Sequence, residues 1–304
     1  MTMIDRLTRR DFVVAATLGA ASARLGLAGR VPPRRLNVGH TGITWGYAPP
    51  AAEQAVADVA SLGYHALESF GSVLAWWDQQ RGGLQPVLER HALPLRGAYC
   101  PFELTDASKR RENRERAALW GRLIRQCGGT IAVVGPNTVA RPGFDMARER
   151  AGIVATLNEV GHALADAGVT GALHPHSGSC VQTRDDVYAV MNAVDTRVVK
   201  LAPDVGELTA GGADPLPILR DFLPVIRHVH LKDYDGGPVR DGYCPVGRGH
   251  VDMAAVVDVL ERSTEELMLM VELNPAPDLP ASASRTAAAT SKAFLQTLGY
   301  TFRS

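Results

Sequence analysis

The sequence predicts a barrel of eight parallel β-strands that alternate with helices, the (β/α)₈ or TIM barrel. Two observations predict this fold class. First, short apolar segments rich in β-branched residues alternate with longer amphipathic segments from residue 36 to the end of the 304-residue chain. Second, several of these apolar segments end in a side chain that can bind a metal. We expect such side chains to meet, because the active site of a barrel lies at the carboxyl ends of its strands.

The expected strands are residues 36–43, 65–70, 95–100, 130–134, 170–176, 198–204, 226–231 and 267–273. The expected helices are residues 49–62, 84–91, 109–127, 146–167, 184–194, 215–222, 253–262 and 281–298, and Thr183 is expected to cap the fifth of them. A doubly wound open sheet is the alternative, but the sequence lacks the Gly-x-Gly-x-x-Gly fingerprint after an early strand. We therefore expect one barrel domain over residues 31–304.

Composition narrows the class of protein. The formal net charge is zero, 21% of residues are charged and 6% are aromatic, which fits a globular protein without the basic excess of a nucleic-acid binder. The four cysteines form no Cys-x-x-Cys pair, so we expect structural thiols and no zinc–cysteine cluster. No apolar segment is long enough for a stable membrane span.

The first 30 residues have the form of a twin-arginine export signal. Arg9 and Arg10 precede Phe12 and a run of small apolar residues, and 21–23 (Ala-Ser-Ala) offers a cleavage site. A short amphipathic helix is the alternative, but a helix that faced a core would carry larger side chains. The expectation is export through the twin-arginine translocase to the periplasm or beyond.

The most informative segment is residues 226–233, Ile-Arg-His-Val-His-Leu-Lys-Asp. Strand side chains alternate between faces, so His228, His230 and Lys232 are expected to share one face. Buried polar groups need partners, which here are either other core residues or a metal. Three further strand ends favour the metal, since they carry His174 with His176, Asp204, and Glu272 with Asn274. Imidazoles with carboxylates suit Mn²⁺, Co²⁺, Zn²⁺ or Fe²⁺, and the carboxylates also permit Mg²⁺.

An ordered set of motifs resembles the xylose isomerase-like barrel superfamily of sugar isomerases and epimerases, and within it the inosose dehydratase-like branch. The motifs are Ile43-Thr-Trp45, Leu173-His-Pro-His-Ser-Gly-Ser179, Val181-Gln-Thr183, Pro203-Asp204, His228-Val-His-Leu-Lys-Asp233, Pro245-Val-Gly-Arg-Gly249, Asp252 and Val271-Glu272. They span nearly the whole expected barrel in the right order. The resemblance implies a divalent-metal enzyme that enolises a keto-sugar or keto-polyol, ending in isomerisation, epimerisation or dehydration.

The resemblance also implies roles for particular residues. The implied metal ligands are His174, Asp204, His230 and Glu272. Substrate contacts are expected from His176, His228, Arg248 and Trp45, and the expected catalytic groups are Glu207, Lys232 and Glu68. Lys232 beside a cation would have a lowered pKa, as suits a base, and an ion pair with Asp233 or Glu272 is the alternative.

The chain departs from the family pattern at three positions. His174 stands where glutamate is common, Glu207 stands where histidine is usual, and Arg248 replaces a small or acidic residue. Glu207 is interpreted as a ligand, as a partner of His174 or His176, as a base with a pKa near neutrality, or as an exposed loop residue.

Two other functions stay open at this point. One is a non-catalytic barrel with a decayed metal or sugar site, which the unusual Glu207 and Arg248 would fit. The other is a metal-dependent phosphodiesterase or endonuclease of the same superfamily, although the neutral charge balance disfavours it. The expected partner is a small carbohydrate, and assembly into a homo-oligomer is left open.

Overall fold

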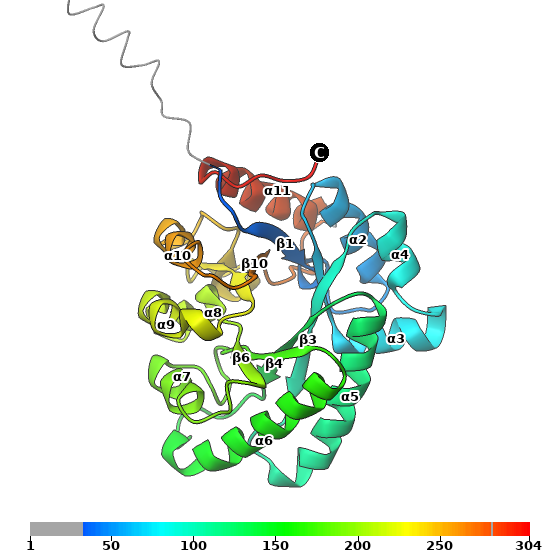
Figure 1. The fold of residues 1–304 in the computed structure, drawn as a ribbon. Helices are drawn as coiled ribbons and strands as arrows, with labels where there is room; N and C mark the ends of the chain where they lie inside the picture. The colour runs from blue at the N-terminus through cyan, green and yellow to red at the C-terminus, as the bar shows by residue number, and fades with distance from the viewer. Residues whose placement is uncertain (1–32, 281) are drawn as a thin grey trace, which may run out of the picture. The chain divides into compact units, whose positions relative to one another are not determined.

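Eight parallel strands form the sheet at the centre of the computed structural model, and helices surround it (Figure 1). The structure describes residues 33–280 and 282–304, so the expected export signal at residues 1–30 lies outside it. The strands are β1 (Asn37–Thr41), β2 (Leu67–Phe70), β3 (Leu95–Phe102), β4 (Ile131–Pro136), β5 (Thr170–Leu173), β6 (Val199–Leu201), β7 (Val229–Leu231) and β10 (Met268–Val271). All eight expected strands are present at the expected places.

The strands follow the order β6-β5-β4-β3-β2-β1-β10-β7, which is the chain order of a TIM barrel opened between its sixth and seventh strands. The sheet curls until these two edges meet at isolated parallel bridges between Leu201 and Ile226 and between Asp204 and His230. The amide of His230 donates to the carbonyl of Pro203 at 3.0 Å. The predicted fold class is therefore confirmed, and the closing contact lies within the expected metal site.

The helices are α2 (Ala51–Ser61), α3 (Gly71–Arg81), α4 (Gln85–Arg90), α5 (Arg110–Gln126), α6 (Met146–Asp166), α7 (Arg184–Met191), α8 (Val205–Ala210), α9 (Pro215–Phe222), α10 (Met253–Leu260) and α11 (Ser282–Thr297). Short 3₁₀ helices are η1 (Gly42–Trp45), η2 (Ala107–Lys109), η3 (Leu223–Val225) and η4 (Arg240–Gly242), and β8 (Asp233–Tyr234) pairs with β9 (Tyr243–Cys244). Thr183 caps α7 as expected, with Asp186 completing a capping box.

Two helices were not expected from the sequence. Helix α3 starts directly after β2, without a side-chain cap at its amino end, and its tryptophans and glutamines do not give a clear apolar stripe. Helix α8 is a single short element of Val-Gly-Glu-Leu-Thr-Ala, whose cap is the expected metal ligand Asp204. The segment after β6 is therefore helical rather than a loop.

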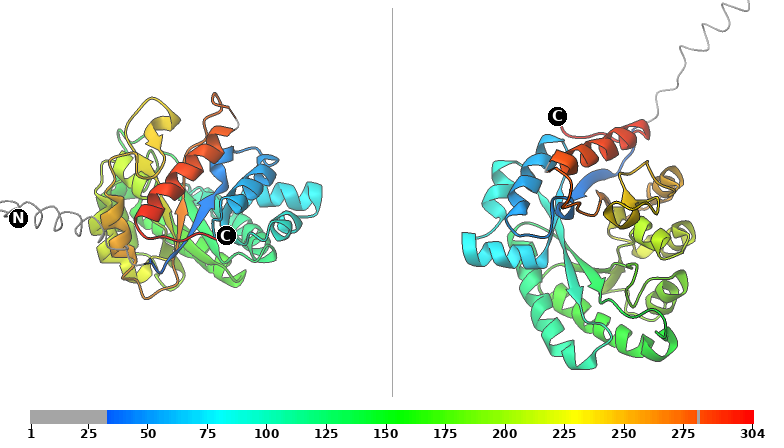
Figure 2. Two further views of the ribbon diagram at one scale, coloured as in Figure 1. Left: turned by 90° about the horizontal axis from the view of Figure 1, so that it is seen from above. Right: turned by 180° about the vertical axis from the view of Figure 1, so that it is seen from behind.

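The main hydrophobic core lies between the sheet and the helices, with Val229 and Leu231 among its buried residues. A small separate cluster comprises Ile131, Val133, Ala172 and Ala202. Helix α11 packs beside α2, where the Tyr64 hydroxyl donates to the carbonyl of Ala288 (Figure 2). Within residues 33–280 and 282–304, no helix is both long and apolar enough to cross a membrane. The four cysteines are unpaired.

Candidate metal centre

Strand β7 directs its polar side chains into the barrel and its apolar ones toward the helices. Val229 and Leu231 are fully buried in the main core, whereas His228 and His230 both contact Glu68 of β2. Lys232 follows on the same side and is only 1% exposed. The alternation expected for residues 226–233 is therefore confirmed, and Lys232 does not reach solvent.

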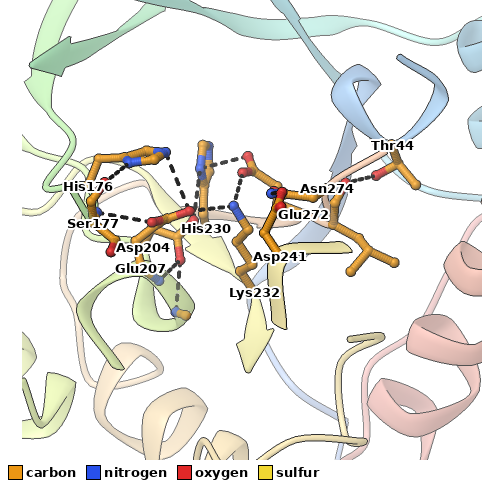
Figure 3. A network of polar contacts seen from close by, with 12 residues as sticks. Thr44, His176, Ser177, Asp204, Glu207, His230, Lys232, Asp241, Glu272 and Asn274 are labelled. Carbon is orange, nitrogen blue, oxygen red and sulfur yellow. Dashed lines mark hydrogen bonds and ion pairs between the residues drawn. The ribbon is translucent and has the colours of Figure 1, made fainter. Parts of the chain in front are cut away.

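The four expected ligand residues meet at the carboxyl end of the barrel, where Figure 3 shows three of them. His174 follows β5, Asp204 follows β6, His230 lies on β7 and Glu272 follows β10. Ligand atoms of His174, Asp204 and His230 all lie within 4.8 Å of one another, and Nδ1 of His230 lies 3.0 Å from Oε2 of Glu272. All four side chains are buried.

Three of the ligand atoms are buried without a hydrogen-bond partner: Nδ1 of His174, Oδ2 of Asp204 and Nδ1 of His230. The last is close to Glu272 but is not aligned with it as a hydrogen bond requires. Burying one polar atom unpaired costs about 1–3 kcal/mol, so such atoms are rare. Three of them in one place, all of types that ligate divalent metals, fit a bound cation.

Hydrogen bonds on the far side of two ligands leave their inner atoms free. Oδ1 of Asp204 accepts from the amides of Gly206 and Glu207, both at 2.8 Å, and so caps α8. Oδ2 then faces Nδ1 of His230 at 3.7 Å. Nε2 of His230 lies 2.9 Å from Oε2 of Glu68, so Nε2 carries a proton and Nδ1 is the nitrogen available to a metal.

The carboxylates of the site favour a positive charge near His230. Burial alone would lower the pKa of His230, but the carboxylates of Glu68 and Glu272 raise it well above its usual value. Burial and the neighbouring imidazoles hold the pKa of His174 well below its usual value, so His174 is neutral and suited to ligation. A bound divalent cation would supply the charge that the carboxylates around His230 require.

Glu68 joins the two histidines of β7 from below. Its Oε2 accepts from Nε2 of His228 at 2.5 Å and from Nε2 of His230 at 2.9 Å. Burial would raise the pKa of Glu68, but the two imidazoles lower it, so it is a carboxylate. Because Oε2 is occupied by both rings, Glu68 is placed to orient His230. Its side chain also lines the cavity above the site, so a contact with substrate stays a prediction.

His228 does not have the substrate contact expected of it. It is fully buried, its ring packs against that of His230, and it is not among the described residues that line the cavity above the site. The reason is strand geometry, since a residue two positions before His230 lies one step deeper in the barrel. This expectation is corrected: His228 supports the site from within.

Glu207 lies in the first turn of α8 and is buried, so it is not an exposed loop residue. Its Oε1 accepts from Nζ of Lys232 at 2.6 Å and its Oε2 from the amide of Ser177 at 3.0 Å. Burial would raise the pKa of Glu207, but Lys232 and His176 lower it. The interpretation of Glu207 as a base with a pKa near neutrality is therefore wrong.

Lys232 bridges two carboxylates and is not a base with a lowered pKa. Nζ donates to Glu207 at 2.6 Å and to Glu272 at 3.0 Å (Figure 3). It also lies 4.0 Å from the ring centre of Tyr243. Burial alone would lower the pKa of Lys232, but Glu272 and Glu207 raise it well above its usual value. The expected ion pair with Glu272 is present, whereas Asp233 instead accepts from amides of the loop at residues 247–251.

His176 stands at the edge of the site with a half-buried ring. Nδ1 donates to the carbonyl of Ser177 at 2.7 Å, because a carbonyl oxygen only accepts. Nε2 therefore keeps its lone pair in the neutral ring, and it lies 3.4 Å from Oε1 of Glu207. His176 also lines the cavity, so its Nε2 can reach a bound molecule.

A cavity of about 400 Å³ opens above these residues. The cavity is lined by six residues that the sequence analysis named: Glu68, His174, His176, Lys232, Glu272 and Asn274. It is also lined by side chains that the sequence analysis did not single out: Tyr47, Phe70, Tyr99, Thr138 and Asp241. Tyr99 packs edge-on against His174, with ring centres 5.5 Å apart. Tyr99 could have been proposed from the sequence, because it lies on an expected strand of the barrel. Asp241 could not, because it lies in a long loop whose path the sequence does not define.

Two expected substrate contacts lie outside this cavity. Arg248 is exposed and lines a shallow hollow beside α11. The loop that carries Arg248 is held by hydrogen bonds from the amides on either side of this residue to Asp233. Trp45 donates its indole N–H to Asp58 at 2.8 Å and lines a second, neighbouring cavity. Arg248 is therefore removed from the site, and Trp45 is moved to its outer part.

Comparison with known proteins finds a sequence relative and solved structures of the same fold. The inosose dehydratase of Clostridium botulinum (strain Alaska E43 / Type E3) is 25% identical over 253 residues, which cover 75% of this chain and 83% of that protein. The structure of IolI protein with a bound zinc atom has a TM-score of 0.69 at 18% identity and covers 87% of this chain and 98% of that one. The apo 3-keto-D-glucoside 4-epimerase from E. coli has a TM-score of 0.67 at 18% identity and covers 86% of this chain and all of that one (100%).

The resemblance suggested by the motifs extends over most of the described barrel. A family-level sequence profile described as xylose isomerase-like TIM barrel matches residues 56–297. This range begins in α2 and ends with α11, so it includes every candidate ligand. The chain therefore belongs to the xylose isomerase-like TIM barrel family.

Proposed function

We propose that the protein is a divalent-metal-dependent enzyme that enolises a keto-sugar or keto-polyol and thereby isomerises, epimerises or dehydrates it. The observation that carries the proposal is the set of three buried, unpartnered ligand atoms on His174, Asp204 and His230 beneath a cavity. The inosose dehydratase relatives support a carbohydrate substrate and favour dehydration as the outcome. The neighbouring structures carry no substrate argument by themselves, because their identities are below 25%.

The residues that would hold the metal are His174, Asp204, His230 and Glu272. A divalent ion bound there would act as a Lewis acid that polarises the keto group and its neighbouring hydroxyl. With two imidazoles and two carboxylates, the ligand set suits Mn²⁺, Co²⁺ or Zn²⁺ better than Mg²⁺, which prefers oxygen ligands.

His176 is the group best placed to remove the proton next to the keto group. Its Nδ1 is fixed by the carbonyl of Ser177, which leaves Nε2 as the basic atom. When Nε2 takes up a proton, the carboxylate of Glu207 at 3.4 Å stabilises the resulting imidazolium. Glu207 is itself held by the amide of Ser177 and by Lys232, so base and carboxylate keep a fixed relation.

Lys232 acts as a positioning residue in this proposal. Its two carboxylate partners and the nearby ring of Tyr243 hold Nζ in place as a charged ammonium, which suits a positioning role better than that of a base. Lys232 binds both Glu207, which lies beside the proposed base His176, and the candidate metal ligand Glu272. It therefore holds the base and the metal ligands in a fixed relation. The rings of Phe70 and Tyr99 contact each other and give the cavity an apolar part.

Proton exchange in D₂O tests the proposed function directly. Protein loaded with Mn²⁺ or Co²⁺ is incubated with inososes and with 3-keto-hexoses and their glycosides, and loss of the proton next to the keto group is followed by NMR. We expect metal-dependent exchange that is abolished by EDTA. If no keto-sugar of the panel exchanges at a metal content near one per chain, the proposal is wrong.

We also propose export by the twin-arginine route, motivated by Arg9, Arg10 and Phe12. Replacing both arginines by lysine should retain the protein in the cytoplasm, as judged by immunoblots of fractionated cells. Equal periplasmic fractions of wild type and variant would overturn the proposal.

A further inference from the structure

A second cavity of about 980 Å³ adjoins the one above the metal centre. The two share Tyr47 and Asp241 as lining residues, so a molecule bound in the inner cavity extends into the outer one between these side chains. Three loops at the carboxyl end of the barrel form the outer cavity: η1 after β1, the loop of η4 after β7, and residues 275–280 after β10. Both cavities therefore open on the face where barrel enzymes bind substrates.

The outer cavity gathers the exposed apolar side chains of the molecule. Among residues 33–280 and 282–304, four large hydrophobic residues are exposed, and three of them line this cavity: Tyr47 (62%), Val239 (52%) and Leu279 (43%). The fourth, Leu119, lies on α5. Trp45 adds a second aromatic ring to the same wall. Clustered exposed apolar side chains beside a cleft mark a binding surface.

The loop that separates the two cavities is held in a strained conformation. Arg240 and Asp241 both have left-handed backbones, with φ of 55° and 58°. Consecutive non-glycine residues in this region persist only where their surroundings fix them, and they concentrate at binding sites. Here the guanidinium of Arg240 donates to the carbonyl of Asn274. The side-chain amide of Asn274 in turn donates to Asp241 at 2.9 Å (Figure 3).

We propose that the outer cavity binds a second ring joined to the keto-sugar, so that the substrate is a keto-glycoside rather than a free keto-sugar. This inference rests on the proposed function and specifies its substrate class. The inner cavity of about 400 Å³ accommodates one sugar ring, and the outer cavity is large enough for another. Tyr47 and Trp45 offer ring faces on which a sugar or phenyl ring stacks.

The charges of the outer cavity argue against a phosphorylated or acidic substituent. Its charged lining residues are Arg240, Asp241 and Asp278, and the guanidinium of Arg240 is already bound to Asn274. Two carboxylates beside one engaged guanidinium repel an anion. The second ring is therefore not anionic.

Calorimetric titration with four probes tests the proposal: free 3-keto-D-glucose and its methyl, phenyl and glucosyl glycosides, each added to Mn²⁺-loaded protein. We expect the phenyl or the glucosyl glycoside to bind at least about tenfold more tightly than the free sugar, as stacking of one ring allows. The methyl glycoside should gain little, because it carries no second ring. A gain with the phenyl arm alone identifies an aromatic substituent, and a gain with the glucosyl arm identifies a disaccharide.

Variants show whether the gain arises in the outer cavity. In Val239→Asp and Leu279→Asp the advantage of the ring-bearing glycoside should fall to about threefold or less, whereas Leu119→Asp should keep it. All three positions are exposed, so thermal melting should not distinguish the variants. Equal affinity of all four probes for wild type, or an advantage that survives both cavity variants, would overturn the inference. Because binding needs no turnover, the result is separate from the proton-exchange test of the proposed function.

Discussion

The molecule contains two His-x-His segments, His174-Pro-His176 and His228-Val-His230, that look alike in sequence but differ in structure. Each supplies one candidate metal ligand, the first residue in one case and the second in the other. The other histidine of each segment differs in its surroundings. His228 is fully buried and bonded to Glu68, whereas His176 is half-buried, lines the cavity and faces Glu207.

The difference follows from where each segment lies relative to the end of its strand. His230 lies on β7 and His228 directly precedes this strand, and both contact Glu68 from two depths of the barrel. Of the two, His230 lies nearer the mouth. His174 and His176 come after β5 has ended at Leu173, with a proline between them. His174 is then at the mouth itself and His176 beyond it. The position of each histidine along the barrel axis, and not its residue type, determines whether it is a candidate ligand, a supporting residue or the proposed base.

The largest effect is expected from removing either ligand histidine. His230→Ala and His174→Ala each delete one of the unpartnered nitrogens, so affinity for Co²⁺ should fall by more than about a hundredfold, beyond the loss typical of changes outside the ligand shell. Competition with a chromophoric chelator measures this. His228→Ala and His176→Ala are the matched controls and should lose about tenfold or less. Equal losses of Co²⁺ affinity in all four variants would contradict the distinction between the two ligand histidines and the other two.

The next effect concerns His176 alone. His176→Asn preserves a polar side chain but has no basic nitrogen, so proton exchange next to the keto group should fall by about a hundredfold while Co²⁺ affinity stays near wild type. Glu207→Gln should slow exchange less, because the base remains. The exposed His250 provides a control as His250→Asn, for which we expect wild-type exchange. Unchanged exchange in His176→Asn would assign the base elsewhere.

A smaller effect, on folding, is expected at His228. His228→Ala leaves a cavity in a fully buried position and removes one of the two donors to Glu68, which should lower the free energy of unfolding by about 2–4 kcal/mol. Urea denaturation of the metal-free protein measures it. The exposed His162 of α6 is the control, since His162→Ala should change stability by less than about 0.5 kcal/mol. An unaltered midpoint in His228→Ala would contradict the supporting role.

The smallest effect is a difference in titration between the two histidines of β7 without metal. Burial lowers the pKa of His228, so its contribution to stability declines as pH falls below about 6.5, where the unfolded chain takes up a proton first. The pKa of His230 is raised by Glu68 and Glu272 against the effect of burial. Its contribution is therefore full below about pH 6.5 and declines as pH rises through the raised pKa. NMR of labelled imidazoles in EDTA should find His228 neutral and His230 protonated at pH 7, and a common midpoint would refute this.

Most of the fold was predictable from the sequence because its signals are local. Each strand is a short apolar run, and each long helix has an apolar stripe and a polar face. Helices α3 and α8 were missed because the first has no clear stripe and the second is shorter than two turns. Helix α3 packs against β2 and helix α8 against β7, and these contacts leave no pattern in the sequence of either helix.

The candidate site was predictable in part, for a similar reason. Three of the ligand residues follow strand ends and His230 lies on the short strand β7, so the barrel topology alone brings the four together. Of the two interpretations of Lys232, the ion pair with Glu272 is present, whereas a lowered pKa is not, because two carboxylates from other elements, Glu207 and Glu272, raise it. Arg248 was misplaced because the path of its loop is decided by the contacts of Asp233 with amides at residues 247–251. The outer cavity depends on three loops whose packing has no sequence signature.

A crystal of the protein soaked in MnCl₂ would test the central claim most directly. Two buried clusters offer metal ligands: His174, Asp204 and His230 at the mouth, and Glu68, His228 and His230 below. We predict one anomalous peak at the mouth, about 2.0–2.3 Å from Nδ1 of His174, Oδ2 of Asp204, Nδ1 of His230 and a carboxylate oxygen of Glu272. A peak between Glu68 and His228 would contradict the account. So would Mn²⁺ bound at full occupancy elsewhere in the protein with no peak near His230.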